Sequence, residues 1–503
     1  MPKFAARGDV YLRDIADRTK KIKQIFWGDW LNVEEETDDG WSKIKWGREL
    51  YWIRTRDCQD ERPLEVVFVD VGQGDGCLLV TPNSPPDEKV MLIDAGEGDN
   101  MYRFIGWRFG KLKKEFNFHA AIITHPDLDH YNGFQRFFDQ KLFSFDKVYH
   151  NGIAERVGDD LLGHSDSTGR YLTDLKPADE DMRTLYADPE IRGRKLYPKL
   201  IHTALTSGRV GAVEMLSTKH GVLRNGRSWM PGFSPNESPD LTIEILGPVV
   251  EPDRRGKPRL RWFGDRVGSR DKDNGKTKNG HSILLRLCYR DFTLLFGGDL
   301  NRPAEDFLLR HYGAIDDDQP LADAVEAARR RLRSDVMKSC HHGAADVTDE
   351  FLQAVDPFAF VVSSGDEESH VHPRPDLLGR LGRHGRGEAP LVLCTEILRS
   401  SREKEDHKQL RRLQKLDALI EAAGAPEAGK KALRAERAAI QKEFAKRNVE
   451  VYGAITVRTN GSHLAVAFRM EKERSGSSPK RWHVYWFKHD QERGFVPESS
   501  AGH

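Results

Sequence analysis

Four side chains able to bind a metal ion lie within six residues of one another. They are His125, Asp127, Asp129 and His130, in the segment THPDLDHYNG that begins at Thr124. Imidazole and carboxylate groups at this spacing can converge on cations without help from distant sequence. Holding such a crowd together in a folded interior is costly without a metal ion. The segment therefore predicts a metal centre, with a helix cap or a surface loop as the alternative interpretation.

The metal-binding segment follows an apolar run at residues 120–124, which predicts a buried strand that ends at the cluster. Further apolar runs at 65–69, 77–80 and 90–93 predict more strands of the same sheet, and the proline-rich stretch 81–88 predicts the connection of a hairpin. Loops at strand ends are where a rigid sheet can place functional groups. These elements are therefore expected to hold the cluster in position.

The cluster resembles the HxHxDH signature of metallo-β-lactamase-fold hydrolases, with Asp127 in place of the second histidine. The resulting HxDxDH pattern is similar to the nuclease domain of ComEC-like competence proteins. The resemblance continues in the family order at residues 69–75 (VDVGQGD), 92–96 (LIDAG), 295–299 (LFGGD), 340–343 (CHHG), 362–365 with 372–373 (VSSG and HP), and 453–461. It implies an α/β fold, the metallo-β-lactamase αββα four-layer sandwich.

The resemblance also implies roles for individual residues in binding two divalent ions. The expected metal ligands are His125 and Asp127 for the first ion, Asp129 and His130 for the second, Asp299 as a bridge between both, and His372 to complete the second site. The alternative interpretations are a helix cap for Asp299 and an exposed loop histidine for His372. Asp94 is expected to orient a ligand from behind.

Other polar residues lie near these motifs. Asp70 and Asp75 are expected to shape the turn beneath the site and to bind no metal. The third ligand motif stays open among three residues, His281, Asn279 and His150. The expected catalytic residues are Asp129, His341 and His342, the two histidines protonating the leaving group or gripping phosphate. For at least one of these two, a structural histidine is the alternative.

The replacement of an imidazole by Asp127 makes the first site richer in oxygen, which favours Mn²⁺ or Mg²⁺ over Zn²⁺. We therefore expect two divalent metal ions, with Mn²⁺ favoured and Zn²⁺ as the alternative. The expected function is phosphodiester hydrolysis by a nuclease that acts on DNA. Two alternatives are hydrolysis of a small phosphodiester such as a cyclic nucleotide, or of an ester or lactone, and a non-catalytic role in nucleic-acid binding or as a scaffold.

The composition sets the domain organisation that we expect. The chain has 503 residues, which suggests one large catalytic domain over 61–470 with insertions at about 155–235 and 252–280. The 79 basic and 79 acidic residues give a formal net charge of zero, so any nucleic-acid-binding surface must be local. The basic stretches 253–278 and 329–333 are candidates for phosphate contacts, or they are solvated surface.

Three further segments differ from the catalytic pattern. Residues 1–60 alternate aromatic and polar groups around turns and resemble a bacterial SH3-like module, with a β extension of the catalytic domain as the alternative. Residues 401–447 have helical spacing interrupted by a Gly-Ala-Pro break, which predicts an inserted helical hairpin. Residues 471–503 are expected to form a C-terminal strand and tail. The module offers a surface for a protein partner, and the hairpin offers one for a homodimer.

The sequence predicts a cytoplasmic protein without a membrane partner. The five cysteines are scattered without CxxC pairs, which fits neither a disulfide framework nor a zinc ribbon and favours a reducing compartment. The N-terminus lacks the apolar region of a secretion signal, and no apolar run approaches the length of about 18 residues needed to span a membrane.

Overall fold

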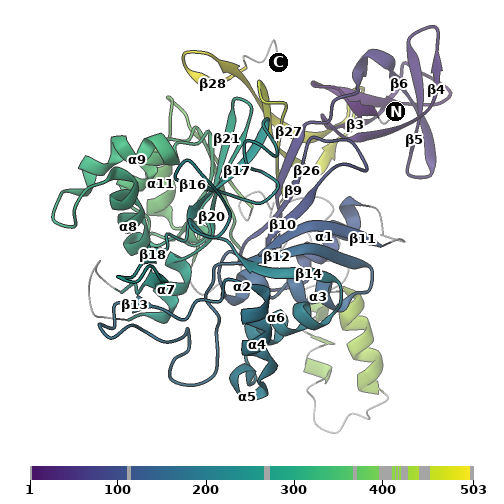
Figure 1. The fold of residues 1–503 in the computed structure, drawn as a ribbon. Coiled ribbons are helices and arrows are strands. Elements are labelled where there is room, and N and C mark those ends of the chain that lie inside the picture. Colours follow the sequence, from purple (N-terminus) through teal and green to yellow (C-terminus); the bar gives the residue numbers. More distant parts are fainter. Residues whose placement is uncertain are drawn as a thin grey trace.

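The structure is a computed structural model that describes residues 3–109, 115–264, 272–365, 371–395, 411–413, 415–416, 418–420, 429–440 and 454–498 (Figure 1). It confirms a mixed α/β fold with several sheets. No helix among the described residues is long and apolar enough to cross a lipid bilayer.

The N-terminal residues form a sheet of their own, drawn in purple in Figure 1. Its core contains Val10, Leu12, Ile25 and Ile44, all nearly inaccessible to solvent, so this part has a hydrophobic centre separate from the rest. Its SH3-like character stays a prediction. In spatial order its strands are β3 (Lys21–Ile25), β2 (Val10–Arg13), β6 (Glu49–Arg54), β5 (Trp41–Trp46), β4 (Trp30–Thr37), β1 (Lys3–Ala5) and β7 (Cys58–Gln59).

A ten-stranded sheet carries the predicted metal-binding segment. Its strands, in spatial order, are β14 (Val210–Met215), β12 (Phe143–His150), β11 (Phe116–Ile122), β10 (Val90–Ala95), β9 (Gly76–Val80), β8 (Leu64–Phe68), β25 (Ile455–Thr459), β26 (His463–Arg474), β27 (Lys480–Asp490) and β28 (Gly494–Pro497). The pairs from β10 to β14 are parallel and the others antiparallel. Strand β26 crosses residue 470, so the domain boundary predicted there falls inside a strand.

An eight-stranded sheet carries the second half of the motifs. Its strands are β15 (Val222–Arg224), β16 (Arg227–Trp229), β17 (Leu241–Gly247), β20 (Leu284–Tyr289), β21 (Phe292–Phe296), β22 (Val336–Lys338), β23 (Ala359–Val362) and β24 (Leu391–Cys394), with β21 to β24 parallel. A small sheet beside it joins β13 (Tyr171–Leu172), β19 (Pro258–Arg261) and β18 (Glu251–Pro252).

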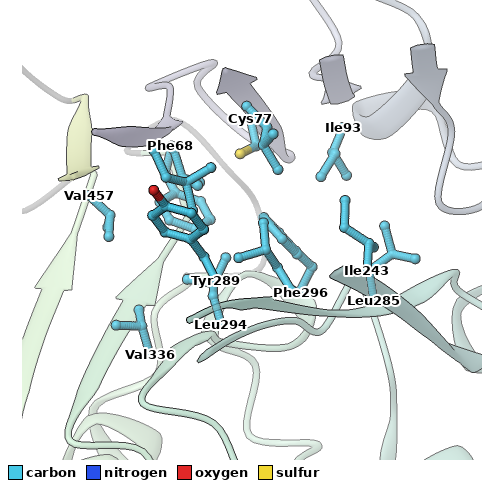
Figure 2. Packing of buried hydrophobic residues seen from close by; sticks show 14 of the residues in the cluster. Phe68, Cys77, Ile93, Ile243, Leu285, Tyr289, Leu294, Phe296, Val336 and Val457 are labelled. Atoms are coloured by element: carbon cyan, nitrogen blue, oxygen red, sulfur yellow. The ribbon is translucent and has the colours of Figure 1, made fainter. Parts of the chain in front are cut away.

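The two large sheets pack face to face around one hydrophobic core. Side chains from both sheets interdigitate there (Figure 2), including Phe68, Ile93 and Val457 from one sheet and Leu285 and Phe296 from the other. All five are at most 5% exposed. Because both faces of these strands are covered, they have nearly continuous apolar sequences, which is why the sequence alone located them.

Helices cover the outer face of each large sheet. The ten-stranded sheet is covered by α1 (Asn100–Arg108), α3 (Phe134–Asp139), α4 (Asp179–Ala187) and α6 (Leu196–Thr206), and the eight-stranded sheet by α8 (Arg302–Gly313), α9 (Val325–Leu332), α10 (Asp349–Val355) and α11 (Pro375–His384). The described layers are therefore helices, sheet, sheet and helices (Figure 1). The shorter helices are α2 (Leu128–Tyr131), α5 (Pro189–Arg192) and α7 (Asn274–Gly280).

One predicted insertion takes part in these layers, and the predicted hairpin is described in part. Residues 155–235 contribute α4, α6 and β14, which extend and cover the ten-stranded sheet, as well as β15 and β16 of the other sheet. The predicted hairpin at 401–447 lies partly outside the described residues. Its described positions 411–413, 415–416, 418–420 and 429–440 are helical, and Arg412 forms an ion pair with Glu436 over 2.8 Å.

Candidate metal centre

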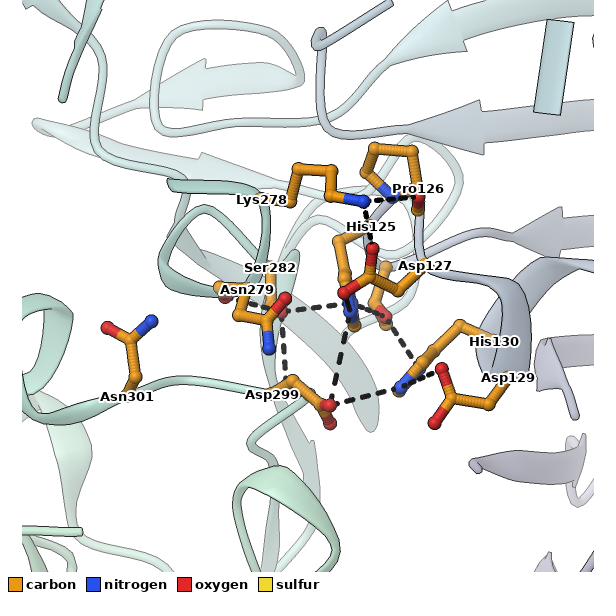
Figure 3. Close-up of polar contacts among 12 residues, drawn as sticks. His125, Pro126, Asp127, Asp129, His130, Lys278, Asn279, Ser282, Asp299 and Asn301 are labelled. Atoms are coloured by element: carbon orange, nitrogen blue, oxygen red, sulfur yellow. Dashed lines mark hydrogen bonds and ion pairs between the residues drawn. The ribbon is translucent and has the colours of Figure 1, made fainter. Parts of the chain in front are cut away.

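The candidate metal centre lies where the ends of strands from both large sheets meet. Strand β11 leads into His125, and α2 begins at Leu128 and carries His130. From the other sheet, β21 leads through two glycines into Asp299, and β22 leads into His342. Residues that are far apart in the sequence thus reach one site (Figure 3).

Three imidazole rings direct their Nε2 atoms toward the same carboxylate. The distance to Asp299 Oδ2 is 3.1 Å from His342, 3.2 Å from His130 and 4.0 Å from His125. The Nε2 atoms of His130 and His342 lie 3.2 Å apart. At this distance the two nitrogens can share a proton in a hydrogen bond or bind one cation together.

Acceptors on the other side of each ring favour the tautomer that leaves Nε2 able to bind metal. Asp94 Oδ2 lies 2.8 Å from the Nδ1 of His130, and the carbonyl oxygen of Ser363 lies 3.2 Å from the Nδ1 of His342. Such partners hold the proton on Nδ1 and leave the Nε2 lone pair facing the site. His125 Nε2 is buried and has no hydrogen-bond partner among the described residues, as expected for an atom that awaits a metal ion.

Two hydroxyl groups lie beside the Nδ1 atom of His125. The Nδ1 atom of His125 lies 3.1 Å from the Oγ1 of Thr124 and 3.3 Å from the Oγ of Ser282. Thr124 donates its hydroxyl proton to Asp94 over 2.6 Å, and Ser282 accepts the backbone N–H of Asp299 over 3.0 Å. One hydrogen-bond network therefore fixes ligands from both sheets (Figure 3).

Several residues of the centre have backbone conformations that are rarely populated. Asp94, His341 and His342 have φ angles of 55°, 47° and 50°, in the left-handed region. Such conformations cost about 1–3 kcal/mol each and cluster at functional sites. Gly74 has a φ of 107°, and a Cβ there would lie 1.9 Å from the carbonyl oxygen of Asp129. Only glycine therefore allows the turn after β8 to approach α2.

Asp127 contacts the first half of the centre and a lysine from the predicted insertion. Its Oδ2 lies 3.6 Å from His125 Nε2, while Oδ1 forms an ion pair with Lys278, which also reaches Glu155 over 3.1 Å. Burial alone would raise the pKa of Asp127, but the neighbouring His125 and Lys278 bring it to about 2. In the amide orientation that satisfies both of its polar atoms, Asn279 donates to Asp127 Oδ2 over 2.8 Å.

Two polar residues in the centre were not assigned to it from the sequence. Asp75 and Lys338 are buried and form an ion pair, and Asp75 Oδ1 lies 3.3 Å from the Nδ1 of His342. The ligand atoms of Asp75, His130, Asp299 and His342 lie within 4.8 Å of one another. The sequence signal for this pair was Lys338 at the end of the apolar strand β22. A lysine in a buried strand is expected to have an acidic partner, because an unpaired lysine is rarely buried.

The remaining predicted residues lie at different distances from the centre. His281 Nε2 donates its proton to the carbonyl oxygen of Arg261 over 2.7 Å, and burial lowers the pKa of His281 to about 4. His150 is buried at the end of β12, where its Nδ1 accepts the backbone N–H of Gly152 over 3.0 Å, and burial lowers its pKa to about 3. One ring nitrogen of each histidine therefore contacts a backbone group.

His341 and His372 form a pair beside the centre. Their ring centroids lie 5.9 Å apart, and the ring of His341 lies 6.2 Å from that of His342. His372 therefore lies next to His341, and His342 lies beside Asp299. Asp129 completes this side, with Oδ2 3.3 Å from His342 Nε2.

The charges of the centre suit divalent cations. Burial alone would raise the pKa of Asp299, but His130 and His342 hold it well below its usual range. Burial opposes protonation of His130, yet the carboxylates of Asp299, Asp94 and Asp129 raise its pKa well above the usual value. These carboxylates thus create a strongly negative potential, which a metal ion would compensate. Carboxylate oxygens together with imidazole nitrogens are suitable ligands for Mn²⁺ and Zn²⁺.

Comparison with known proteins gives two partial similarities. The chain is similar to part of ComE operon protein 3 of Bacillus subtilis (strain 168). The two are 24% identical over 199 residues, which is 38% of this chain and 23% of that protein. The chain is also 32% identical to Competence protein ComA of Neisseria gonorrhoeae over 108 residues, 21% of this chain and 13% of that protein. The chain thus spans less than a quarter of the length of either relative.

Other comparisons add little. No family model matches the chain. Among solved structures, a mutant of the CmlA beta-hydroxylase has a TM-score of 0.32 and 10% identity, with 67% of this chain and 52% of that chain covered. This likeness is too distant to assign a fold.

Proposed function

We propose that the chain is a metal-dependent phosphodiester hydrolase of the metallo-β-lactamase fold that acts on DNA as a nuclease. The observation that carries this proposal is the convergence of the Nε2 atoms of His125, His130 and His342 on Asp299. The arrangement of helices, sheet, sheet and helices supports the fold assignment, and the similarity to two competence proteins supports the family.

The proposed ligands divide into two sets that share Asp299. The first metal ion would be held by His125, Asp127 and Asp299, and the second by Asp129, His130, His342 and Asp299. Because Lys278 engages Oδ1 of Asp127, only Oδ2 of that residue faces His125. Divalent cations at such a site supply Lewis acidity, both toward an attacked phosphate and toward water. The oxygen-rich first set favours Mn²⁺.

The remaining side chains position these ligands and move protons. Asp94 holds the Nδ1 proton of His130, and the carbonyl oxygen of Ser363 does the same for His342. His341 is the proposed proton donor to the leaving oxygen, because it adjoins the ligand set and its Nδ1 has no hydrogen-bond partner among the described residues. Burial lowers the pKa of His341, so its imidazolium form is a stronger acid but is populated only at lower pH.

DNA is the proposed substrate because one relative is named a competence protein, and because the HxDxDH pattern of the ligand set resembles that of ComEC-like nuclease domains. The test uses the purified full chain with Mn²⁺ and labelled single-stranded DNA, duplex DNA, RNA and a cyclic dinucleotide. We expect Mn²⁺-dependent cleavage of DNA that EDTA abolishes. Cleavage of the cyclic dinucleotide alone would indicate that the substrate is a small phosphodiester and not a polymer.

Three variants connect the activity to the proposed ligands. We expect Asp129→Ala and His130→Ala to reduce cleavage to background while circular dichroism shows the fold unchanged. Asp38→Asn is the matched control, since Asp38 is an exposed aspartate of the N-terminal sheet, and it should cleave like the wild type. Full activity in both ligand variants would overturn the proposal.

A further inference from the structure

A second candidate site is a cleft of about 760 Å³ between the N-terminal sheet and the ten-stranded sheet. Its walls come from β3, β4 and β5 on one side, and from α1, β8, β25, β26 and β27 on the other. None of the proposed metal ligands lines it. Its volume lies within the range of about 300–1,000 Å³ that small-molecule sites occupy, so a nucleotide unit fits inside.

Buried contacts hold the two sides of this cleft in place. Arg458 is 4% exposed and donates to Asp29 of the N-terminal part and to Glu65 of β8, both over 2.9 Å. The side-chain oxygen of Gln24 accepts the backbone N–H groups of Arg481 and Trp482 over 2.8 and 3.0 Å. The cleft therefore lies along a packed interface between the N-terminal sheet and the ten-stranded sheet, which we call the seam.

Four tryptophans line the cleft, which is a high density of large aromatic rings for one surface. Trp30 is 60% exposed and Trp107 is 37% exposed, while Trp46 and Trp482 are half-buried. Trp482 stacks on Phe26 with ring centroids 4.7 Å apart. Isolated exposed tryptophans are unremarkable, but rings gathered around a cleft offer flat surfaces on which planar ligands stack.

The lining also carries a net positive charge. It contains six basic side chains and two acidic ones, Asp29 and Glu65. Both acidic groups are neutralised, because Arg458 contacts both and Arg108 contacts Glu65 over 2.6 Å. The lining also contains Lys23, Lys45, Arg469 and Arg481, so its basic side chains outnumber its acidic ones by six to two. An anion in the cleft is therefore favoured over a cation, although the chain as a whole is neutral.

We propose that this cleft binds single-stranded nucleic acid, with bases stacked on its tryptophans and phosphates near its basic groups. Single-strand-binding proteins combine aromatic platforms with a positively charged groove in this way. A duplex keeps its bases stacked inside and would leave the tryptophans unused. An acidic peptide would match the charge but not the flat aromatic surfaces. The inference rests on the proposed function in taking a nucleic acid as the substrate, which the cleft would hold outside the metal centre.

The test measures binding without turnover. Fluorescence anisotropy of labelled oligo(dT) is recorded with the full chain in EDTA over a series of salt concentrations. A labelled duplex and a labelled poly-glutamate peptide are measured in the same way. We expect the single strand to bind more tightly than the duplex or the peptide. Trp30→Ala should weaken binding by about 5- to 150-fold, the effect of losing one stacked base. Lys45→Ala should reduce the slope of log affinity against log salt by about 0.7, the value for one phosphate contact.

Matched controls come from exposed residues elsewhere on the protein. Leu223 is 58% exposed and Lys141 is exposed, and neither lines the cleft, so Leu223→Ala and Lys141→Ala should bind like the wild type. Wild-type affinity in both cleft variants, or preference for the peptide, would overturn the inference. An Asp299→Asn protein that binds oligo(dT) normally but does not cleave DNA separates this result from the proposed nuclease activity.

Discussion

Arg458 connects the N-terminal sheet to the ten-stranded sheet through a buried charge network, and its replacement should be strongly destabilising. The substitution Arg458→Met keeps the length of the side chain but removes the ion pairs to Glu65 and Asp29. Removing one partner of a buried pair costs about 3–5 kcal/mol. Because Glu65 keeps its contact with Arg108 over 2.6 Å, we expect the lower end of this range, about 3 kcal/mol.

The pH dependence of stability gives the same variant a second signature. Burial alone would raise the pKa of Glu65, but Arg108 and Arg458 hold it well below its usual range. A carboxyl group with a lowered pKa in the folded state contributes stability that is present above its unfolded pKa, about 4.3, and is lost as the pH falls. The wild type should therefore lose more stability between about pH 5 and pH 3 than Arg458→Met does.

Urea unfolding followed by tryptophan fluorescence measures both effects, since Trp27 and Trp486 lie at this seam. The matched control is Arg290→Met, which removes an exposed pair with Asp240 over 3.5 Å and should cost less than about 1 kcal/mol. A loss below about 1 kcal/mol for Arg458→Met, with unchanged acid sensitivity, would refute this account of the seam.

Three further substitutions test individual residues. Burial raises the pKa of Glu305 to about 8, so the wild type should lose stability as the pH rises from about 4.5 to 8, and Glu305→Gln should remove this loss in urea unfolding. Asp94→Asn should weaken Mn²⁺ binding by about 10- to 100-fold in a chelator competition assay, because Asp94 orients His130; unchanged affinity would contradict that role. Lys278→Met should tighten binding of one Mn²⁺ ion in calorimetry, since it removes a cation from Asp127, and weaker binding would contradict the contact.

The sequence predicted the local parts of this structure well. Strands β8 to β11 have apolar runs that are readable from the sequence because both faces of the sheet are buried. The cluster from His125 to His130 is readable because its members are adjacent in the chain. The resemblance to a known family predicted that this cluster lies close to Asp299. In the structure, His130 Nε2 lies within hydrogen-bonding range of Asp299 Oδ2.

Long-range packing determined what the sequence did not predict. Asp75 reaches the centre only because the glycine turn at Gly74 approaches α2, and His342 reaches Asp299 only through the left-handed backbone after β22. The pairing of Lys278 with Asp127 joins a predicted surface insertion to the proposed site. Neither periodicity nor composition encodes such contacts, so a polar residue such as Lys338 in an apolar strand was the one local sign of them.

The central claim is that side chains from both sheets hold two metal ions that share Asp299. Anomalous diffraction from crystals grown with Mn²⁺, measured on either side of the manganese edge, tests it directly. We expect two peaks about 3.5–4 Å apart, one beside His125 and Asp127 and the other beside His130 and His342, with Asp299 contacting both. The absence of any manganese peak in contact with Asp299 would contradict the claim.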